Sequence, residues 1–161
     1  NQLLNVAVFP KRYSKGFWVK TPIGQTFKRW DAIRSTKDAG DCDSEDVNRN
    51  GVLDSGEDRN RDGVLTHGNI ASVQQSVTAN NDGIALFNLV YPRDYAGWLD
   101  VDITVSGQAA GSENISTRAF GLAALSDAIN KEDQQPPANP FGSGNEDPVT
   151  KLPAPSFCTF D

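Results

Sequence analysis

The segment Leu99-Asp100-Val101-Asp102-Ile103-Thr104-Val105 decides the fold class. Apolar and polar residues alternate along it, which predicts a β-strand with one face on the core and the other in water. Other short segments rich in β-forming residues lie on both sides of it, over residues 3–9, 16–19, 84–91 and 114–120. Short strands separated by turn residues, with little helix, predict an all-β fold made of two packed antiparallel sheets, a β-sandwich.

Local signals predict where these strands begin and end. Pro10 should end the first strand or confine it to a sheet edge, because proline has no backbone N–H to donate. Asn81-Asp82-Gly83 predicts a hairpin turn between a strand around Val77 and residues 84–91, and residues 108–111 predict a second turn. Leu122, Leu125 and Ile129 have the spacing of one short helix.

Length and composition restrict the class of protein. A chain of 161 residues predicts one domain over residues 1–161, with an acidic insert at residues 41–69 and a Pro- and Gly-rich C-terminal strap at residues 134–161. The net charge of −6 disfavours nucleic acid as a partner, because phosphate binding needs a basic surface. There is no run of 18 apolar residues, so we expect no membrane insertion.

The charge is unevenly distributed. Residues 41–62 contain eight acids and three arginines, whereas residues 1–37 contain eight Lys or Arg and one acid. Clustered carboxylates repel one another, and a folded loop tolerates them only with counterions. This distribution favours bound cations over a bare acidic loop, which is the alternative interpretation.

Two successive twelve-residue stretches carry a calcium-loop pattern, D-x-[DN]-x-[DN]-G-x-hydrophobic. Side chains at positions 1, 3 and 5 converge on an ion when the backbone turns sharply at a glycine in position 6, and position 7 adds its carbonyl. The ligands expected in the first loop are Asp46, Asn48, Asn50, Val52, Asp54 and Glu57. Those expected in the second loop are Asp58, Asn60, Asp62, Val64, Thr66 and Asn69.

The two loops differ at position 12. Glu57 can supply the usual bidentate carboxylate to the first loop, but Asn69 cannot do so for the second. The second loop should therefore bind more weakly or borrow a carboxylate such as Glu57. Asp41, Asp43 and Glu45 are possible extra ligands, including for a third ion. We expect about two calcium ions.

Cys42 and Cys158 are the two cysteines, and no C-x-x-C spacing indicates a metal site. A disulfide between them is expected, with two buried free thiols as the alternative. Such a bridge predicts a location outside the reducing cytoplasm, extracellular or on the cell surface.

Catalytic signatures are absent from the sequence. The one histidine, His67, lies within the second loop at a position expected to face solvent, and no nucleophile motif or phosphate-binding glycine loop occurs. Trp18, Trp30 and Trp98 are expected to pack in or around the core, and a sugar-stacking role is the alternative. We expect no enzymatic activity.

The tandem loops resemble the back-to-back calcium loops of thrombospondin type 3 repeats and, singly, EF-hand and dockerin loops. A second resemblance rests on residues 77–87 followed by residues 98–105. This hairpin and strand resemble bacterial immunoglobulin-like domains of the invasin and intimin type. That resemblance implies an immunoglobulin-like β-sandwich in a repeated, stalk-forming surface adhesin, and the insert and tail indicate a terminal or capping module.

Three functions remain open from the sequence. The first is a calcium-stabilised structural or adhesion module of a bacterial surface or secreted protein, which contacts neighbouring domains or a host or environmental surface ligand. The second is a calcium-dependent carbohydrate-binding module. The third is a calcium-dependent docking module for another protein chain.

Overall fold

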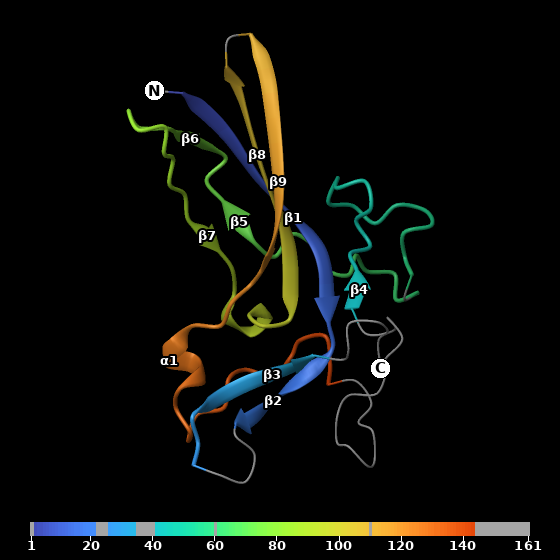
Figure 1. Cartoon of the computed structure of the whole chain (residues 1–161). Coiled ribbons are helices and arrows are strands. Elements are labelled where there is room, and N and C mark those ends of the chain that lie inside the picture. The colour runs from blue at the N-terminus through green and yellow to red at the C-terminus, as the bar shows by residue number, and fades with distance from the viewer. Residues whose placement is uncertain (1, 22–25, 35–40, 60, 110, 144–161) are drawn as a thin grey trace.

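The computed structural model describes residues 2–21, 26–34, 41–59, 61–109 and 111–143, and its strands are antiparallel (Figure 1). The strands are β1 (Leu3–Ser14), β2 (Gly16–Thr21), β3 (Arg29–Arg34), β4 (Asp41–Asp43), β5 (Ser72–Val73), β6 (Ser76–Thr78), β7 (Leu89–Val90), β8 (Leu99–Ala109) and β9 (Ser112–Gly121). The helices are a 3-10 turn η1 (Arg93–Tyr95) and α1 (Ser126–Ile129). The all-β prediction is confirmed, whereas α1 covers only the last part of the helix predicted from Leu122, Leu125 and Ile129.

A five-stranded sheet forms the centre of the molecule. Its order is β4-β1-β8-β9, and β6 pairs with the N-terminal end of β1. Two two-stranded ribbons, β2-β3 and β5-β7, complete the described strands. The immunoglobulin-like sandwich stays a prediction, because this sheet and these ribbons do not by themselves define that topology.

β1 is longer than the sequence predicted, since it continues through Pro10 to Ser14. Pro10 lies opposite Val101 of β8, and the register shifts between Pro10 and Arg12. There β1 has left β6 behind and has not yet reached β4. At Pro10, the side of β1 that faces away from β8 pairs with no described strand. The N–H that proline lacks would therefore have had no partner strand, which explains why Pro10 does not end β1.

The hairpin predicted at residues 81–83 is wrong in part. The turn exists, because the Asn80 N–H donates to the Ile84 carbonyl at 2.8 Å and Gly83 adopts a φ of 77°. The flanking segments do not pair with each other, since β6 pairs with β1 and β7 pairs with β5. Tertiary pairing with β1 thus overrides the local hairpin signal.

The predicted alternation of apolar and polar residues along β8 is confirmed, but two residues of its polar face are buried. Leu99 and Val101 are buried, and Asp100 and Asp102 on the opposite face are also only 8% exposed. Ion pairs with basic residues of other elements cover both carboxylates. A buried carboxylate is tolerated when it is paired in this way.

Aromatic side chains form much of the hydrophobic core. Trp18, Trp30 and Trp98 are 8%, 7% and 0% exposed, in agreement with the packing role predicted for them. Trp18 and Trp98 meet edge to face at 5.2 Å between centroids. Gly16 lets Trp98 and β3 lie this close to β2, because a Cβ at residue 16 would lie 2.9 Å from the Trp98 ring and 2.1 Å from the Ile33 carbonyl oxygen.

The described part of the strap, residues 134–143, has no helix or strand and packs across β2 and β3. The Trp18 indole N–H donates to the Pro137 carbonyl at 2.9 Å. The Trp30 indole N–H donates to the Lys131 carbonyl, just before the strap, at the same distance. The strap is thus held by backbone carbonyls that accept from buried tryptophans, and Phe141 is buried.

Candidate metal centre

The first predicted calcium loop has the backbone shape that the pattern requires. Gly51, at position 6, has a φ of 76°, which a side chain at that position would disfavour. Asp46, at position 1, accepts from the N–H of Asn50 at 2.9 Å and from that of Gly51 at 3.0 Å. This carboxylate therefore sits at the centre of the turn and fixes its curvature.

Glu57 closes the first loop. One of its carboxylate oxygens accepts from the Val47 N–H at 3.1 Å, and the other accepts from the Asp54 N–H at 3.0 Å. Asp54 in turn accepts from the side-chain amides of Asn48 and Asn50 at 2.7 and 2.8 Å. Hydrogen bonds thus bring the side chains of Asn48, Asn50 and Asp54 together, and Glu57 joins the two ends of the loop.

The second loop repeats the same geometry. Gly63 has a φ of 75°, and Asp58 accepts from the N–H of Asp62 at 3.2 Å and from that of Gly63 at 3.1 Å. Arg49 and Arg61, each at position 4 of its loop, share a φ of 63°. Two copies of one unusual backbone path follow from two copies of one sequence pattern.

Glu45 closes the second loop. Its carboxylate accepts from the Arg59 N–H at 2.9 Å and from the Thr66 N–H at 2.8 Å. These are positions 2 and 9 of the second loop, the same positions that Glu57 bridges in the first. The sequence named Glu57 as a carboxylate to borrow and Glu45 only as an extra ligand, and the structure places Glu45 in that role.

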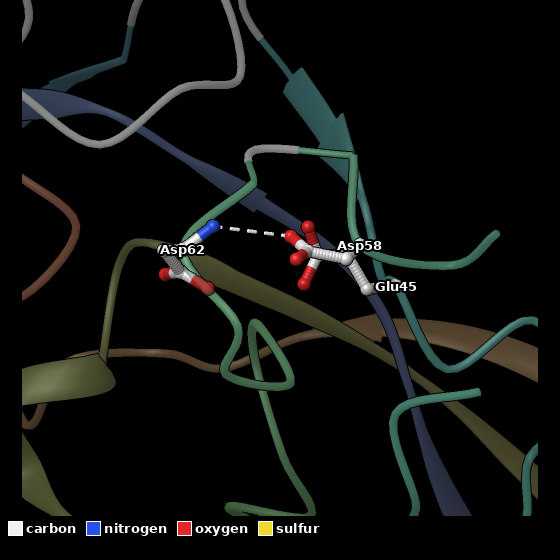
Figure 2. Close-up of side chains that lie close together, drawn as sticks. All are labelled: Glu45, Asp58 and Asp62. Carbon is white, nitrogen blue, oxygen red and sulfur yellow. Dashed lines mark hydrogen bonds between the residues drawn. The ribbon is translucent and has the colours of Figure 1, made fainter. Parts of the chain in front are cut away.

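Carboxylate oxygens of Glu45, Asp58 and Asp62 lie within 4.8 Å of one another and could hold a metal ion (Figure 2). Glu45 is 2% exposed, whereas Asp62 is exposed to solvent. Three carboxylates at this separation repel one another unless a cation lies among them. The donors are oxygens, which suit hard divalent ions better than zinc or copper.

The remaining predicted ligands are distributed around these loops. Val52 and Val64 expose their side chains, which is compatible with carbonyls turned inward. Thr66 is buried, while Asn69 lines a hollow beside β1 and β5. Asn60 lies outside the described residues, as does the side chain of Asp41. The Asp43 carboxylate is largely exposed and pairs with Arg59 at 3.5 Å.

The sequence contains a feature that indicates the role of Glu45, although it lies outside the calcium-loop pattern. Glu45 immediately precedes Asp46, just as Glu57 immediately precedes Asp58. Each position-1 aspartate is therefore preceded by a glutamate. Which loop each glutamate closes depends on how the two loops fold against each other, and a pattern read along the chain does not contain that information.

Arginine side chains anchor the insert to the sheet. Arg49 donates to Asp102 on β8 at 2.8 Å and lies over the Phe9 ring, 5.0 Å from its centroid. Arg49 thus pairs with β8, so the first loop is fixed to the central sheet.

Aromatic side chains pack around His67 of the second loop. His67 is 3% exposed, which corrects the expectation that it faces solvent. Its ring meets Tyr13 edge to face at 5.4 Å and Phe141 at 5.8 Å. Burial lowers the pKa of His67 to about 4, against a smaller opposing effect of the Gly68 backbone, so this ring is neutral at pH 7.

The negative charges of the acidic cluster affect the pKa of Tyr13. Burial, and to a smaller extent the negative charges of Glu45 and Asp62, raise the pKa of Tyr13 to about 12. The phenol is therefore protonated at physiological pH. It packs between the core and the second loop, which joins the metal centre to β1.

Cys42 is 1% exposed in β4, at the start of the insert. Cys158 lies outside the described residues, so the predicted bridge between them stays a prediction. Across the described residues, no helix is long and apolar enough to cross a membrane.

Comparisons with protein-family models, with curated proteins and with solved structures found no match to this chain. The resemblance to invasin- and intimin-type domains therefore stays an expectation from the sequence.

Proposed function

We propose that this chain is a non-enzymatic structural or adhesion module, stabilised by calcium, of a secreted or surface-displayed bacterial protein. The observation that carries the proposal is the repeated loop geometry, in which Glu45 and Glu57 close two loops of one calcium pattern. At the second loop, the carboxylates of Glu45, Asp58 and Asp62 also come together, and oxygen donors of this kind suit calcium.

The role proposed for the ions is to stabilise the fold. The loops follow each other directly, and each is already fixed by hydrogen bonds to its own carboxylates. Arg49 and the packing of His67 hold them on the sheet. A rigid support of this kind suits ions that neutralise charge and stiffen the insert. It does not suit a sensor that opens a helix pair.

An extracellular location belongs to the same proposal. Extracellular calcium is near millimolar, which saturates even modest sites. The predicted bridge between Cys42 and Cys158 would also persist only in an oxidising compartment.

The carbohydrate-binding alternative receives less support. Sugar platforms use exposed aromatic faces, and all three tryptophans are at most 8% exposed. Calcium-dependent retention on a glycan array, lost in the Trp18→Ala variant, would favour that alternative over the structural role.

Calorimetric titration with calcium, together with thermal unfolding in chelator and in millimolar calcium, tests the proposal. We expect binding of about two ions and a rise in Tm of several degrees. Asp58→Asn should remove one binding event, because Asp58 lies at the centre of the second loop. Asp82→Asn, which removes the same charge from an exposed turn, is the matched control. The absence of binding heat and of any Tm shift would refute the calcium role.

A further inference from the structure

The outer edge of β9 is unusually open. β9 pairs with β8 over its whole length, Ser112–Gly121, with no register shift, and it is the last strand of its sheet. All ten of its residues are exposed, including Ile115 at 66%. Proteins usually protect an edge strand with charged residues, proline, a bulge or short length. β9 is ten residues long, has no proline and no bulge, and its charged residues are Glu113 and Arg118, which have opposite signs.

The hydrogen-bonding groups at this edge can be assigned. The Leu122 N–H donates to the Leu99 carbonyl at 2.9 Å, so this residue pair, next to the end of β9, is a hydrogen-bonded one. Such pairs alternate along an antiparallel ladder. Glu113, Ile115, Thr117 and Ala119 therefore have their N–H and C=O groups turned away from β8, toward the open edge.

We infer that this edge binds β9 of a second copy of the chain, antiparallel and about a two-fold axis. In one register, Ile115 lies opposite Thr117 of the other copy and Glu113 lies opposite Ala119. These four residues then make hydrogen-bonded pairs, and the axis passes between the two Ser116 residues. Pairing of a β-branched residue with another β-branched residue also stabilises the centre of the ladder.

Charge supports self-pairing and selects this register. β9 carries one acid and one base, Glu113 and Arg118, so it is neutral in a chain of net charge −6. In the proposed register Arg118 lies opposite Asn114, and no like charges meet. Shifting the strands until Arg118 faces Arg118, or Glu113 faces Glu113, places like charges in contact.

Cysteine cross-linking tests the geometry. In this register the two Ser116 residues form a non-hydrogen-bonded pair with Cα atoms about 4.5 Å apart, within disulfide range. Ser116→Cys should therefore form a disulfide-linked dimer in air, at least about tenfold faster than Thr117→Cys. Two residues at position 117 are displaced diagonally by about 7–8 Å, which makes Thr117→Cys the matched control. Equal cross-linking of the two variants would overturn the register.

Sedimentation velocity over a range of concentrations tests the association itself. We expect the unmodified chain to form a dimer that dissociates on dilution, because a single added strand is a small interface. Thr117→Pro removes one outward N–H without affecting the bonds to β8, and it should remain monomeric with an unchanged circular dichroism spectrum. An unmodified chain that stays monomeric, or a dimer that Thr117→Pro leaves intact, would overturn the inference.

Discussion

Glu45 and Glu57 show how single residues determine the candidate metal centre. Each bridges the backbone N–H groups at positions 2 and 9 of one loop. Both are buried, at 2% and 8% exposure, so each is a carboxylate removed from water and supported by N–H donors. Their separate positions make the two sites separable by mutation.

Glu45→Gln and Glu57→Gln should each remove one calcium-binding event and leave the other. Glutamine keeps the size of the side chain but loses the negative charge that a bidentate ligand supplies. Calorimetric titration of each variant should show a stoichiometry of one where the unmodified chain shows two. Loss of both events in Glu57→Gln alone would mean that Glu57 serves both loops.

The environment of Asp100 should make the free energy of unfolding depend on pH. Burial alone would raise the pKa of Asp100, but hydrogen bonds and charges from Arg12 and Arg34 outweigh burial and lower it. The folded pKa is thus below the unfolded one, so the stabilisation is present above the unfolded pKa and is lost as pH falls through the folded pKa. Asp100→Asn should cost about 3 kcal/mol at pH 7.

Urea unfolding of the unmodified chain and of Asp100→Asn between pH 7 and pH 2 measures this effect. The difference in unfolding free energy should shrink as pH falls, because protonation removes the charge from the unmodified chain as well. Asp94→Asn, at an exposed position in η1, is the control and should show no such trend. A difference that does not change with pH would contradict the assignment.

At the scale of elements, β1 connects the parts of the molecule. It pairs with β4, β6 and β8 and continues almost directly into β2. The strap then crosses β2 and β3 and is held by indole N–H groups. The strap has no hydrophobic core of its own, so its order depends on these few contacts.

Trp30→Phe should loosen the chain from residue 131 to residue 141. The variant loses the hydrogen bond to the Lys131 carbonyl and part of the buried ring, at a cost of about 2 kcal/mol. Hydrogen exchange should show faster exchange in this segment than the global loss of stability explains. Trp98→Phe is the control, since its indole nitrogen has no hydrogen-bond partner among the described residues. Equal effects of the two variants on this segment would contradict the role of Trp30.

At the scale of the whole molecule, the insert and the C-terminal region lie far apart in sequence. Cys42 stands where β4 enters the insert, and Cys158 is near the C-terminal end of the chain. A bridge between them would close a loop of more than 100 residues. In the chain-entropy account, such a loop contributes roughly 4 to 5 kcal/mol through the unfolded state.

Reduction should therefore lower the unfolding free energy by about 4 kcal/mol in the presence of calcium. Urea unfolding with and without reductant measures this change, and thiol titration of the denatured, non-reduced chain should find no free cysteine. The double variant Cys42→Ala and Cys158→Ala should be insensitive to reductant. Two free thiols in the denatured chain would contradict the bridge.

The sequence by itself determined the all-β class, the β8 strand, a helical turn before residue 129 and the backbone path of the two acidic loops. These features depend on side-chain alternation and on local backbone preferences, such as glycine at position 6, which neighbouring residues specify. The tertiary structure alone decided that Glu45 closes the second loop, that Arg49 pairs with Asp102 on β8, that His67 is buried, and that β6 pairs with β1 instead of forming the predicted hairpin. The physical reason is that these contacts join residues far apart along the chain, and their free energy depends on burial and on partners that no local pattern contains.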